Sequence, residues 1–573
     1  MYMKHITPRP HGTKGWFGTL TQAAVMVLLW PGLPAHGQQL ERVSHGIGGD
    51  PNAPCFSSGA GHQVSADGRF VVYVSAASNL VANDHNGMDD VFWVDRLTGE
   101  TRFLSRSIWG GQSGNGPSED ASISLDGQSV AFRSFASDLW FGDGNGLPDI
   151  FLVQIQGSSQ SLTVVTVGTG LDQTNGSSDG PCLSGNGGFV TYFSDAINLV
   201  AGDTNNKSDI FVFNRATFAT ELVSFGPGFG PANGHSFTPA ISDDGNLVTW
   251  TSFASDHVAN DTNGTADVFV FDRSARVLQR ASVASSSGAQ GNGGSGDAEI
   301  SGDGNVVGFI SGATNLVPGD TNQEPDAFVH LRSTGITERV SVNTSGIQGD
   351  GETSDRMSLS FDGLLVAFES GATNFAPTGT DVDVFLRDRK NLRTTLLGVD
   401  QNGNALVKGS QNPDLMSDGR AAIFNSINPY GGETDLDFDV FLIHRLTFRT
   451  FGAGWPGTLG RIPNLDGTDA FPSGGHTLVL TNGLPSTTGL MWIGFGQTDL
   501  YPVFGGAHFY VNLSLPFFVF PIQLAPDGSW IVNGSPVSAL LGLNLYCQAT
   551  LHDPGAVRGV STTNGLEIRI GVQ

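Results

Sequence analysis

One unit of about 60 residues is repeated seven times along this sequence, and the repeat constrains the fold more than any other feature. An Asp-Gly or Asn-Gly turn recurs at spacings of 59, 60, 58, 59, 59 and 56 residues: Gly68, Gly127, Gly187, Gly245, Gly304, Gly363 and Gly419. An Asp-(Val/Ile/Ala)-Phe marker follows each turn: Asp90, Asp149, Asp209, Asp267, Asp326, Asp383 and Asp439. Two markers in one order at a fixed spacing predict a repeat architecture.

Each unit has the pattern of four short strands. In the fourth unit, Pro239–Ile241 leads into the turn, and Leu247–Ser252, Val268–Phe271 and Arg276–Ser282 are rich in strand-forming residues. Sustained helical periodicity is absent between residues 38 and 454. Four short antiparallel strands repeated seven times predict an all-β protein with a seven-bladed β-propeller. A solenoid is the alternative, but these units lack the short parallel rungs that it needs.

The turn sequences also resemble a known family. Ser65-Ala-Asp-Gly-Arg-Phe-Val-Val-Tyr, Ser242-Asp-Asp-Gly-Asn-Leu-Val-Thr-Trp and Ser360-Phe-Asp-Gly-Leu-Leu-Val-Ala-Phe are similar to the Ser-Pro-Asp-Gly-Arg-x-Ile-Ala-Phe core of TolB-type, WD-like propeller repeats. The resemblance covers roughly residues 40–454. The units lack the proline after serine and are longer than is usual in that family. The resemblance implies a propeller with a binding role and does not identify a partner.

The segments that flank the repeats predict two further parts. Residues 1–37 have the pattern of a secretory signal, because basic residues precede the apolar run Leu20–Trp30 and Ala35-His36-Gly37 is a small-x-small cleavage site. We therefore expect a secreted or periplasmic protein, cleaved near Gly37, with the propeller at residues 38–454. No later run is apolar enough to span a membrane.

The repeat stops at a glycine-rich junction, and residues 455–573 contain short alternating runs that predict a small C-terminal β-sandwich domain. This region resembles a C-terminal module of secreted bacterial proteins, in a Gly-x-Gly-x-Pro-Gly motif, in Leu543-Asn-Leu-Tyr-x-Gln-Ala549 and in Thr563-Asn-Gly-Leu-Glu-Ile. The resemblance leaves secretion, surface attachment and binding open as its role.

The charge of the chain excludes some partners. Removal of the three basic residues in 1–37 leaves 25 Lys and Arg against 54 Asp and Glu, a formal net charge of −29. This acidity argues against nucleic acid and against an anionic membrane surface. We expect a monomer. Of the three cysteines, a Cys55–Cys182 bridge is left open, because only geometry decides it, and Cys547 is interpreted as a buried thiol.

No motif in the sequence identifies a catalytic site. Gly176-Ser-Ser-Asp-Gly180 matches Gly-x-Ser-x-Gly but lies in a polar loop, without the strand and helix that a nucleophile elbow needs. The thirteen histidines are dispersed, so a zinc site is unsupported. We favour a non-enzymatic binding module that presents propeller loops to a glycan, protein or surface. The alternative is a secreted polysaccharide-acting lyase or glycosidase, which convergent Asp, Glu, His and Arg side chains in the channel would indicate.

Five loops between the second and third strands carry Asp-x-Asn-x-x-x-Asp, a spacing that suits oxygen ligation of calcium. The candidate ligands are Asp84, Asn86, Asp90, Asp143, Asn145, Asp149, Asp203, Asn205, Asp209, Asp261, Asn263, Asp267, Asp320, Asn322 and Asp326. The alternative is purely structural, because Asp and Asn also close turns by bonding to the local backbone. The sixth and seventh units lack the asparagine.

Two features predict contacts within the ring. Arginines that end the third strand should pair with the turn aspartates, as Asp67–Arg96, Asp244–Arg273, Asp303–Arg332, Asp362–Arg389 and Asp418–Arg445. The segment Leu40–Ser44 matches the unit-ending strand Thr337–Ser341, which suggests that it completes the last unit. Phe448–Phe451 is the competing candidate, and the sequence leaves this choice open.

Overall fold

The computed structural model describes residues 39–375 except 58, 171 and 286, then residues 382–399, 405–406, 409–427 and 437–444, and the strands between residues 447 and 569. Strands and their connections make up this part of the chain, with one short 3-10 helix, η1 (Pro227–Phe229). In these described residues no helix is long and apolar enough to cross a membrane. The predicted signal at 1–37, most of the glycine-rich junction, and Arg445 lie outside them.

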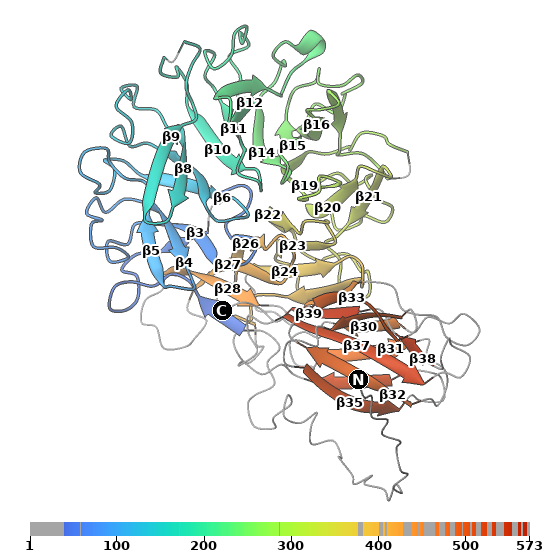
Figure 1. The fold of residues 1–573 in the computed structure, drawn as a ribbon. Helices are drawn as coiled ribbons and strands as arrows, with labels where there is room; N and C mark the ends of the chain where they lie inside the picture. Colours follow the sequence, from blue (N-terminus) through green and yellow to red (C-terminus); the bar gives the residue numbers. More distant parts are fainter. Residues whose placement is uncertain are drawn as a thin grey trace, which may run out of the picture.

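Seven antiparallel four-stranded sheets are arranged as blades in a ring (Figure 1). Blade one contains β2 (Cys55–Phe56), β3 (Phe70–Ser75), β4 (Asp90–Asp95) and β5 (Glu100–Phe103), and blade two contains β6 (Ser118–Ile123), β7 (Ser129–Ser134), β8 (Asp149–Gln156) and β9 (Ser159–Val164). Blade three contains β10 (Ser178–Leu183), β11 (Phe189–Ser194), β12 (Asp209–Asn214) and β13 (Ala219–Leu222), and blade four contains β14 (Ser236–Ile241), β15 (Leu247–Ser252), β16 (Asp267–Asp272) and β17 (Val277–Arg280). Blade five contains β18 (Ser295–Ile300), β19 (Val306–Ser311), β20 (Asp326–Leu331) and β21 (Ile336–Arg339). Blade six contains β22 (Thr353–Leu359), β23 (Leu365–Ser370), β24 (Asp383–Asp388) and β25 (Arg393–Leu396). Blade seven contains β26 (Gln411–Leu415), β27 (Ala421–Ile427), β28 (Phe438–His444) and β1 (Gln39–Arg42). The predicted seven-bladed propeller is confirmed.

The ring is closed by the N-terminal side of the described chain. Strand β1 pairs antiparallel with β28, with Leu40 opposite Ile443, so it forms the outer edge of blade seven. The Ser44 hydroxyl donates a hydrogen bond of 2.5 Å to Asp439 and strengthens this contact. The competing segment forms β29 (Thr447–Phe451), which pairs with β39 (Gly565–Arg569) near the end of the chain. The choice that the sequence left open is thereby decided.

The remaining strands form antiparallel sheets of their own. One sheet has the order β29-β39-β37-β32-β35 with β38 beside β37, a second has β30-β31-β36, and a third has β33-β34. Their bounds are β30 (Asn464–Thr468), β31 (His476–Thr481), β32 (Thr488–Gly494), β33 (Gln497–Phe504), β34 (Ala507–Val511), β35 (Phe517–Gln523), β36 (Trp530–Gly534), β37 (Asn544–His552) and β38 (Val560–Thr562). The β-sandwich arrangement of this region stays a prediction.

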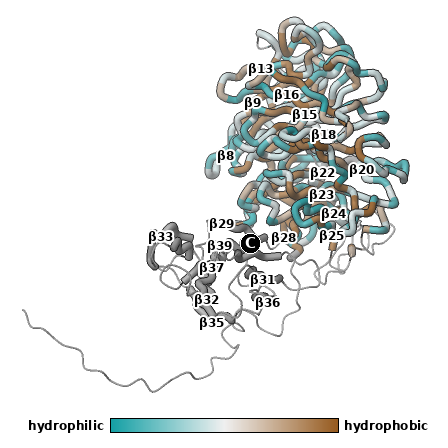
Figure 2. Tube along the Cα trace, turned by 90° about the vertical axis from the view of Figure 1, so that its right-hand side faces the viewer, coloured by the Kyte–Doolittle hydropathy of each residue, from teal (hydrophilic) through white to brown (hydrophobic). Residues whose placement is uncertain are grey.

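The middle strands of each blade are buried on both faces, because every sheet packs between two neighbours. Figure 2 shows hydrophobic stretches of chain among the propeller strands. A cross-strand aromatic pair recurs in their cores: Tyr73–Phe92, Phe132–Phe151, Tyr192–Phe211 and Phe309–Phe328, with ring centroids 5.7 to 5.8 Å apart. Such a pair contributes about 0.5–1.5 kcal/mol beyond its buried area. The fourth strands lie at the rim and most are more exposed, as β17 shows, whereas β25 keeps two buried residues.

The predicted pairing of arginines with turn aspartates is wrong in the four blades where both partners are described, and Arg445, the partner predicted for Asp418, lies outside the described residues. Arg273 donates to the carbonyl of Gly245 at 2.5 Å and pairs with Glu221 of the preceding blade at 3.1 Å. Arg389 likewise contacts Gly363 and Glu338. Arg332 donates to the Gly304 carbonyl, and Arg96 contacts Gly68 and Glu41.

The turn aspartates are occupied within their own turns, which explains the different pairing. In the fourth turn, Asp244 accepts a hydrogen bond of 2.7 Å from the Ser242 hydroxyl and one of 2.9 Å from the Asn246 amide. The glycine that follows has φ +78°, a left-handed conformation that explains its recurrence. The arginines therefore bind the turn carbonyl and join neighbouring blades.

The Cys55–Cys182 bridge does not form, because both cysteines are free and buried. The Cys55 sulfur lies 3.3 Å from the Ser75 hydroxyl. Cys182 lies in the inner strand of blade three, where a Cβ on Gly61 would come within 2.6 Å of its sulfur. The side chain of Cys547 lies outside the described residues.

Candidate functional site

A ring of hydrogen bonds between blades encircles the channel at the level of the Ser-x-Asp-Gly turns. Each link joins one turn to the turn of the next blade: Ala66 N to Leu125 O, Leu125 N to Gly185 O, Asn186 N to Asp243 O, Asp243 N to Gly302 O, Asp303 N to Phe361 O and Phe361 N to Ser417 O, at 2.6 to 3.0 Å. Arg420 completes the circle by donating from its guanidinium to the Ala66 carbonyl at 2.9 Å. The turns therefore form a rigid end to the channel.

The first blade inserts extra residues into the channel. Seven residues separate Phe56 from Val64 on its inner edge, where three separate Glu119 from Ile123 in the second blade. Their partners on the second strand are spaced alike in the two blades, so the additional residues loop out. Gly59 in this loop has φ +131°, and a Cβ there would lie 2.5 Å from the Ala121 carbonyl. The loop carries His62 into the channel.

His62 forms an ion pair with Asp243 of the fourth turn, with its Nε2 3.2 Å from Oδ1. Burial alone would lower the pKa of His62, but the hydrogen bond with Asp243 and the charges of Asp414, Asp243 and Glu299 raise it to about 9. Asp243 fits because glycine occupies the equivalent turn position on either side. A Cβ on Gly185 or Gly302 would lie 2.5 or 2.4 Å from its carboxylate oxygens.

Two acidic side chains lie close to this pair. Asp414 is 3% exposed and accepts hydrogen bonds from the Gln63 amide at 2.8 Å and the Ser358 hydroxyl at 3.0 Å. Burial raises the pKa of Asp414 above its usual range, although the charge of His62 opposes this. Burial raises the pKa of Glu299 to about 8, so this side chain keeps its proton at neutral pH. The channel therefore holds a neutral carboxyl beside ionised groups.

Further basic and acidic side chains lie together on the first two strands of blades two, three and six. Arg356 donates to the Gly59 carbonyl at 2.7 Å. Arg133 forms ion pairs with Glu119 and Asp179 and lies 3.5 Å from Asp120. Burial raises the pKa of Asp120 to about 6, against the lowering effect of Arg133.

Left-handed residues occupy the bulge of several inner strands: Asp120, Gly180, Thr238, Asp297 and Asn412, with φ between +46° and +57°. Such bulges redirect side chains, here toward the channel.

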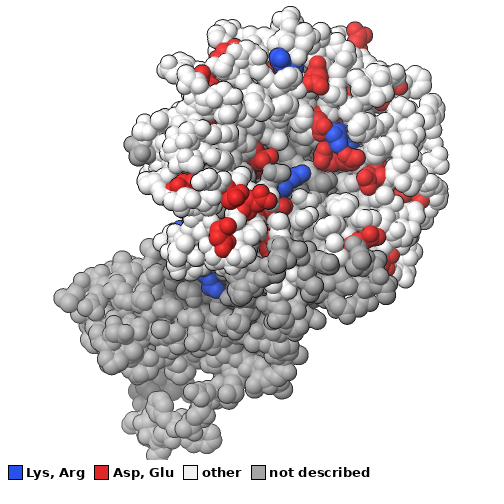
Figure 3. Space-filling model, turned by 180° about the vertical axis from the view of Figure 1, so that it is seen from behind, with Lys and Arg blue, Asp and Glu red and all other residues white. Residues whose placement is uncertain are grey.

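Some of these groups line a cavity of about 380 Å³. Its walls include Asp120, Asp297, Glu299, Asp414 and Arg356. Figure 3 shows acidic side chains, with fewer basic ones, gathered around the centre of the ring. Because acids outnumber bases in the lining, the cavity favours a neutral or cationic ligand over an anion.

An aromatic series extends from the wall of this cavity. Phe193 lines the cavity and lies 5.7 Å from Phe237, whose ring is 5.9 Å from His235 and 6.3 Å from Phe253. Phe253 is 58% exposed, so the series reaches solvent. Apolar rings beside a few convergent polar groups are typical of small-ligand pockets.

The five loops predicted to bind calcium each bring their two aspartates toward the same place, but their asparagines have another role. Each asparagine oxygen accepts the N–H two residues later, at 2.7 to 3.2 Å: Met88, Leu147, Lys207, Thr265 and Glu324. Each asparagine nitrogen donates to a carbonyl in the link to the next blade: Gly114, Thr174, Ala232, Gly291 and Gly349. The asparagines therefore close loops, in agreement with the structural alternative.

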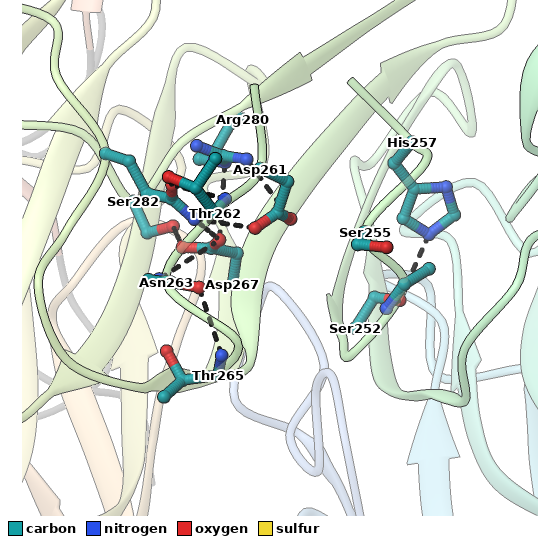
Figure 4. A network of polar contacts seen from close by, with 12 residues as sticks. Ser252, Ser255, His257, Asp261, Thr262, Asn263, Thr265, Asp267, Arg280 and Ser282 are labelled. Carbon is teal, nitrogen blue, oxygen red and sulfur yellow. Dashed lines mark hydrogen bonds and ion pairs between the residues drawn. The ribbon is translucent and has the colours of Figure 1, made fainter. Parts of the chain in front are cut away.

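The second aspartate of each loop begins the third strand and is buried. It accepts a hydrogen bond from a hydroxyl at the end of the blade: Ser105, Thr166, Ser224, Ser282 and Ser341. In blade four the Arg280 guanidinium lies 3.1 Å from Asp261 and 3.4 Å from Asp267 (Figure 4). Gln290 donates a hydrogen bond to each of these aspartates. Arg339 and Gln348 do the same in blade five: 3.2 Å to Asp320 and 3.2 Å to Asp326. In blades four and five an arginine side chain therefore supplies the positive charge that compensates the two aspartates.

In blade two Gln173 donates to Asp143 at 2.7 Å, whereas Asp149 accepts from Thr166 and Thr174. Across the described residues, no group of three or more His, Cys, Asp or Glu side chains is placed to hold a metal ion.

The channel residues were not identified from the sequence. The available signal was departure from the repeat, because Asp243 stands where neighbouring turns have glycine and His62 lies in an insertion.

Comparisons with known proteins add the following. No protein-family model and no curated sequence matches this chain. An oligogalacturonate lyase from Vibrio parahaemolyticus is 11% identical, with 71% of this chain and 96% of that chain covered and a TM-score of 0.44. A putative TolB from Agrobacterium tumefaciens is 18% identical, with coverage of 52% and 85% and a TM-score of 0.31. The propeller domain of the Trilobed protease from Pyrococcus furiosus is 10% identical, with coverage of 64% and 92% and a TM-score of 0.35.

These TM-scores lie below 0.5, so the fold rests on the strand pairing of this chain and not on its neighbours. The pairing defines a seven-bladed β-propeller whose last blade is completed by an N-terminal strand. Within it, side chains from several blades converge on one channel cavity.

Proposed function

We propose that this propeller is a glycan-binding protein whose site is the channel cavity, and that it prefers a short glycan with amino groups. The convergence of Asp120, Asp297, Glu299 and Asp414 in one cavity supports this proposal most directly. Carboxylates accept hydrogen bonds from hydroxyl and ammonium groups, and ionised acceptors make the stronger bonds. The cavity volume of about 380 Å³ suits one or two sugar rings.

The aromatic series gives the ligand a path into the cavity. The apolar face of a sugar ring packs on Phe253 and Phe237 at the rim, and Phe193 continues this surface to the wall. His62 and Asp243 then stiffen the inner end, since their ion pair links blade one to blade four. Secretion through the predicted signal at 1–37 would bring this cavity to extracellular glycans.

The charge of the lining separates glycan classes. A uronic acid would place its carboxylate among the acidic side chains with Arg356 as the basic group of the lining, so repulsion and desolvation oppose binding. An amino sugar places an ammonium there instead. We therefore expect glucosamine oligomers to bind more tightly than neutral glucose oligomers, and galacturonate oligomers to bind least.

A titration series tests this order. The protein is titrated calorimetrically at pH 7.5 with glucosamine, glucose and galacturonate tetramers, and the Asp120→Asn variant is compared with the surface variant Glu324→Gln. Loss of one charged hydrogen bond costs about 1.5–3 kcal/mol, so Asp120→Asn should weaken glucosamine binding roughly 10- to 100-fold. The proposal fails if no tetramer binds, or if galacturonate binds most tightly.

Hydrolysis of a bound glycan is the second candidate function. Two observations favour it. Asp, Glu, His and Arg side chains converge at the channel, which is the arrangement that we expect of a polysaccharide-acting enzyme. Glu299 also has a pKa of about 8, and a protonated carboxyl near ionised ones is what a glycosidase general acid requires. Release of reducing ends from a glucosamine hexamer, lost in Glu299→Gln with binding retained, would support this function. Binding without release in the wild type would leave the protein a binding module.

A further inference from the structure

The loops with two aspartates differ in the side chains placed against them. Arg280 and Arg339 each lie on the fourth strand of their blade, opposite the phenylalanine of the Asp-x-Phe marker. The residues at the same position in blades one, two and three are Phe103, Val164 and Leu222. The equivalents of Gln290 and Gln348 are given by a recurring bridge: Ser113, Gln173 and Pro231. Blades one and three therefore have neither the arginine nor the glutamine.

The first aspartates of these two blades are buried without adequate donors. Asp84 is 2% exposed, and neither of its carboxylate oxygens has a hydrogen-bond partner. The Asn86 amide and the Ser113 hydroxyl lie close enough to oppose the rise that burial causes in the pKa of Asp84, but neither reaches the distance and angle of a hydrogen bond. In blade three Asp203 is 5% exposed, and its Oδ1 has no partner. Within the described part of the chain neither aspartate forms an ion pair.

We propose that blades one and three each bind a calcium ion at these loops, between Asp84 and Asp90 and between Asp203 and Asp209. Two buried carboxylates in one place need a compensating positive charge, because desolvation of an unpaired charge costs several kcal/mol. Blades four and five meet this need with Arg280 and Arg339. Where the chain has Phe103 or Leu222 instead, a cation takes the equivalent place.

The available ligands suit calcium better than a transition metal. Calcium takes six to eight oxygens from carboxylates, carbonyls and water, whereas softer metals prefer nitrogen or sulfur. Asp84 and Asp203 supply unpartnered oxygens, and the second aspartates supply one oxygen each from carboxylates that already accept Asn86 or Asn205. With only two carboxylates per site, carbonyls and water complete the shell, so binding should be in the weak range of about 10⁻⁴–10⁻³ M.

Calcium stoichiometry tests the proposal. The purified protein is equilibrated with millimolar calcium chloride, and bound calcium is measured by equilibrium dialysis and elemental analysis. We expect one ion at each of the two loops, with one ion lost in Asp84→Asn and one lost in Asp203→Asn. Asp261→Asn, in the arginine-filled blade four, is the matched control and should lose none. No bound calcium in the wild type, or equal losses in all three variants, would overturn the proposal.

A second variant transfers the blade-four solution to blade three. Leu222→Arg with Pro231→Gln places a guanidinium and an amide opposite Asp203 and Asp209. We expect this variant to bind one calcium ion fewer and to lose less thermal stability in EDTA than the wild type, with circular dichroism confirming that it folds. Unchanged calcium binding in the folded variant would overturn the assignment of blade three.

Discussion

Replacing Glu299 by glutamine should remove one contribution to the pH dependence of propeller stability. Burial raises the pKa of Glu299 from 4.5 to about 8. The folded protein therefore keeps a proton that the unfolded chain loses, so stability falls as the pH rises from about 4.5 to 8 and levels above that range. At about 1.36 kcal/mol per pKa unit, the change amounts to at most about 5 kcal/mol.

Thermal unfolding followed between pH 5 and pH 8.5 measures this effect. The Glu299→Gln variant lacks the titrating group, so it should gain stability relative to the wild type as the pH rises. For a unit of this size about 1 kcal/mol corresponds to about 1 °C, so the difference between the two midpoints should change by up to roughly 5 °C. His62, whose pKa is raised to about 9 partly by Glu299, adds a loss in the same direction between about 6.5 and 9.

The matched control is Glu324→Gln, which changes an exposed surface glutamate and should follow the wild-type profile. If the unfolding midpoints of Glu299→Gln and the wild type differ by the same amount at every pH, Glu299 is ionised in the folded protein. The protonated carboxyl in the channel would then be refuted, and the hydrolytic candidate with it.

Three further results are expected. Arg389→Ala removes the link to Glu338 and Gly363 and should destabilise the propeller by about 1–3 kcal/mol. A double-mutant cycle with Glu338→Ala should show coupling between blades five and six, and additive effects of the two substitutions would contradict this link. Leu40→Asp places a carboxylate in the core of blade seven and should release β1, so mild protease should cut near residue 40 faster than in the wild type. Gly185→Ala brings a Cβ within 2.5 Å of Asp243, so nuclear magnetic resonance titration should show the pKa of His62 falling from about 9; an unchanged value would contradict the ion pair.

The propeller was predictable from the sequence because its determinants are local and periodic. The Asp-Gly turns and the Asp-x-Phe markers each depend on a few neighbouring residues, and seven copies make the pattern unambiguous. Ring closure was not predictable, because Leu40–Ser44 and Phe448–Phe451 have similar strand character and only pairing with β28 separates them. The arginine contacts failed for a related reason, since the turn carboxylates are already satisfied within their turns.

The candidate site was hidden because its residues are far apart in the chain and do not repeat. His62, Asp243, Glu299 and Asp414 come from blades one, four, five and seven, and they meet only once the ring is closed. The calcium loops show the opposite case, since a repeated motif was visible but the deciding side chains were not part of it. Arg280 and Arg339 lie one strand away, so strand register is needed to separate arginine-filled loops from the loops in blades one and three.

The location of a bound glycan tests the central proposal most directly. Crystals soaked with a glucosamine tetramer should show sugar density inside the channel, in contact with Asp120 and Glu299 and packed against Phe193. Density on the outer loops, with the channel free of sugar, would contradict the assignment of the channel as the binding site.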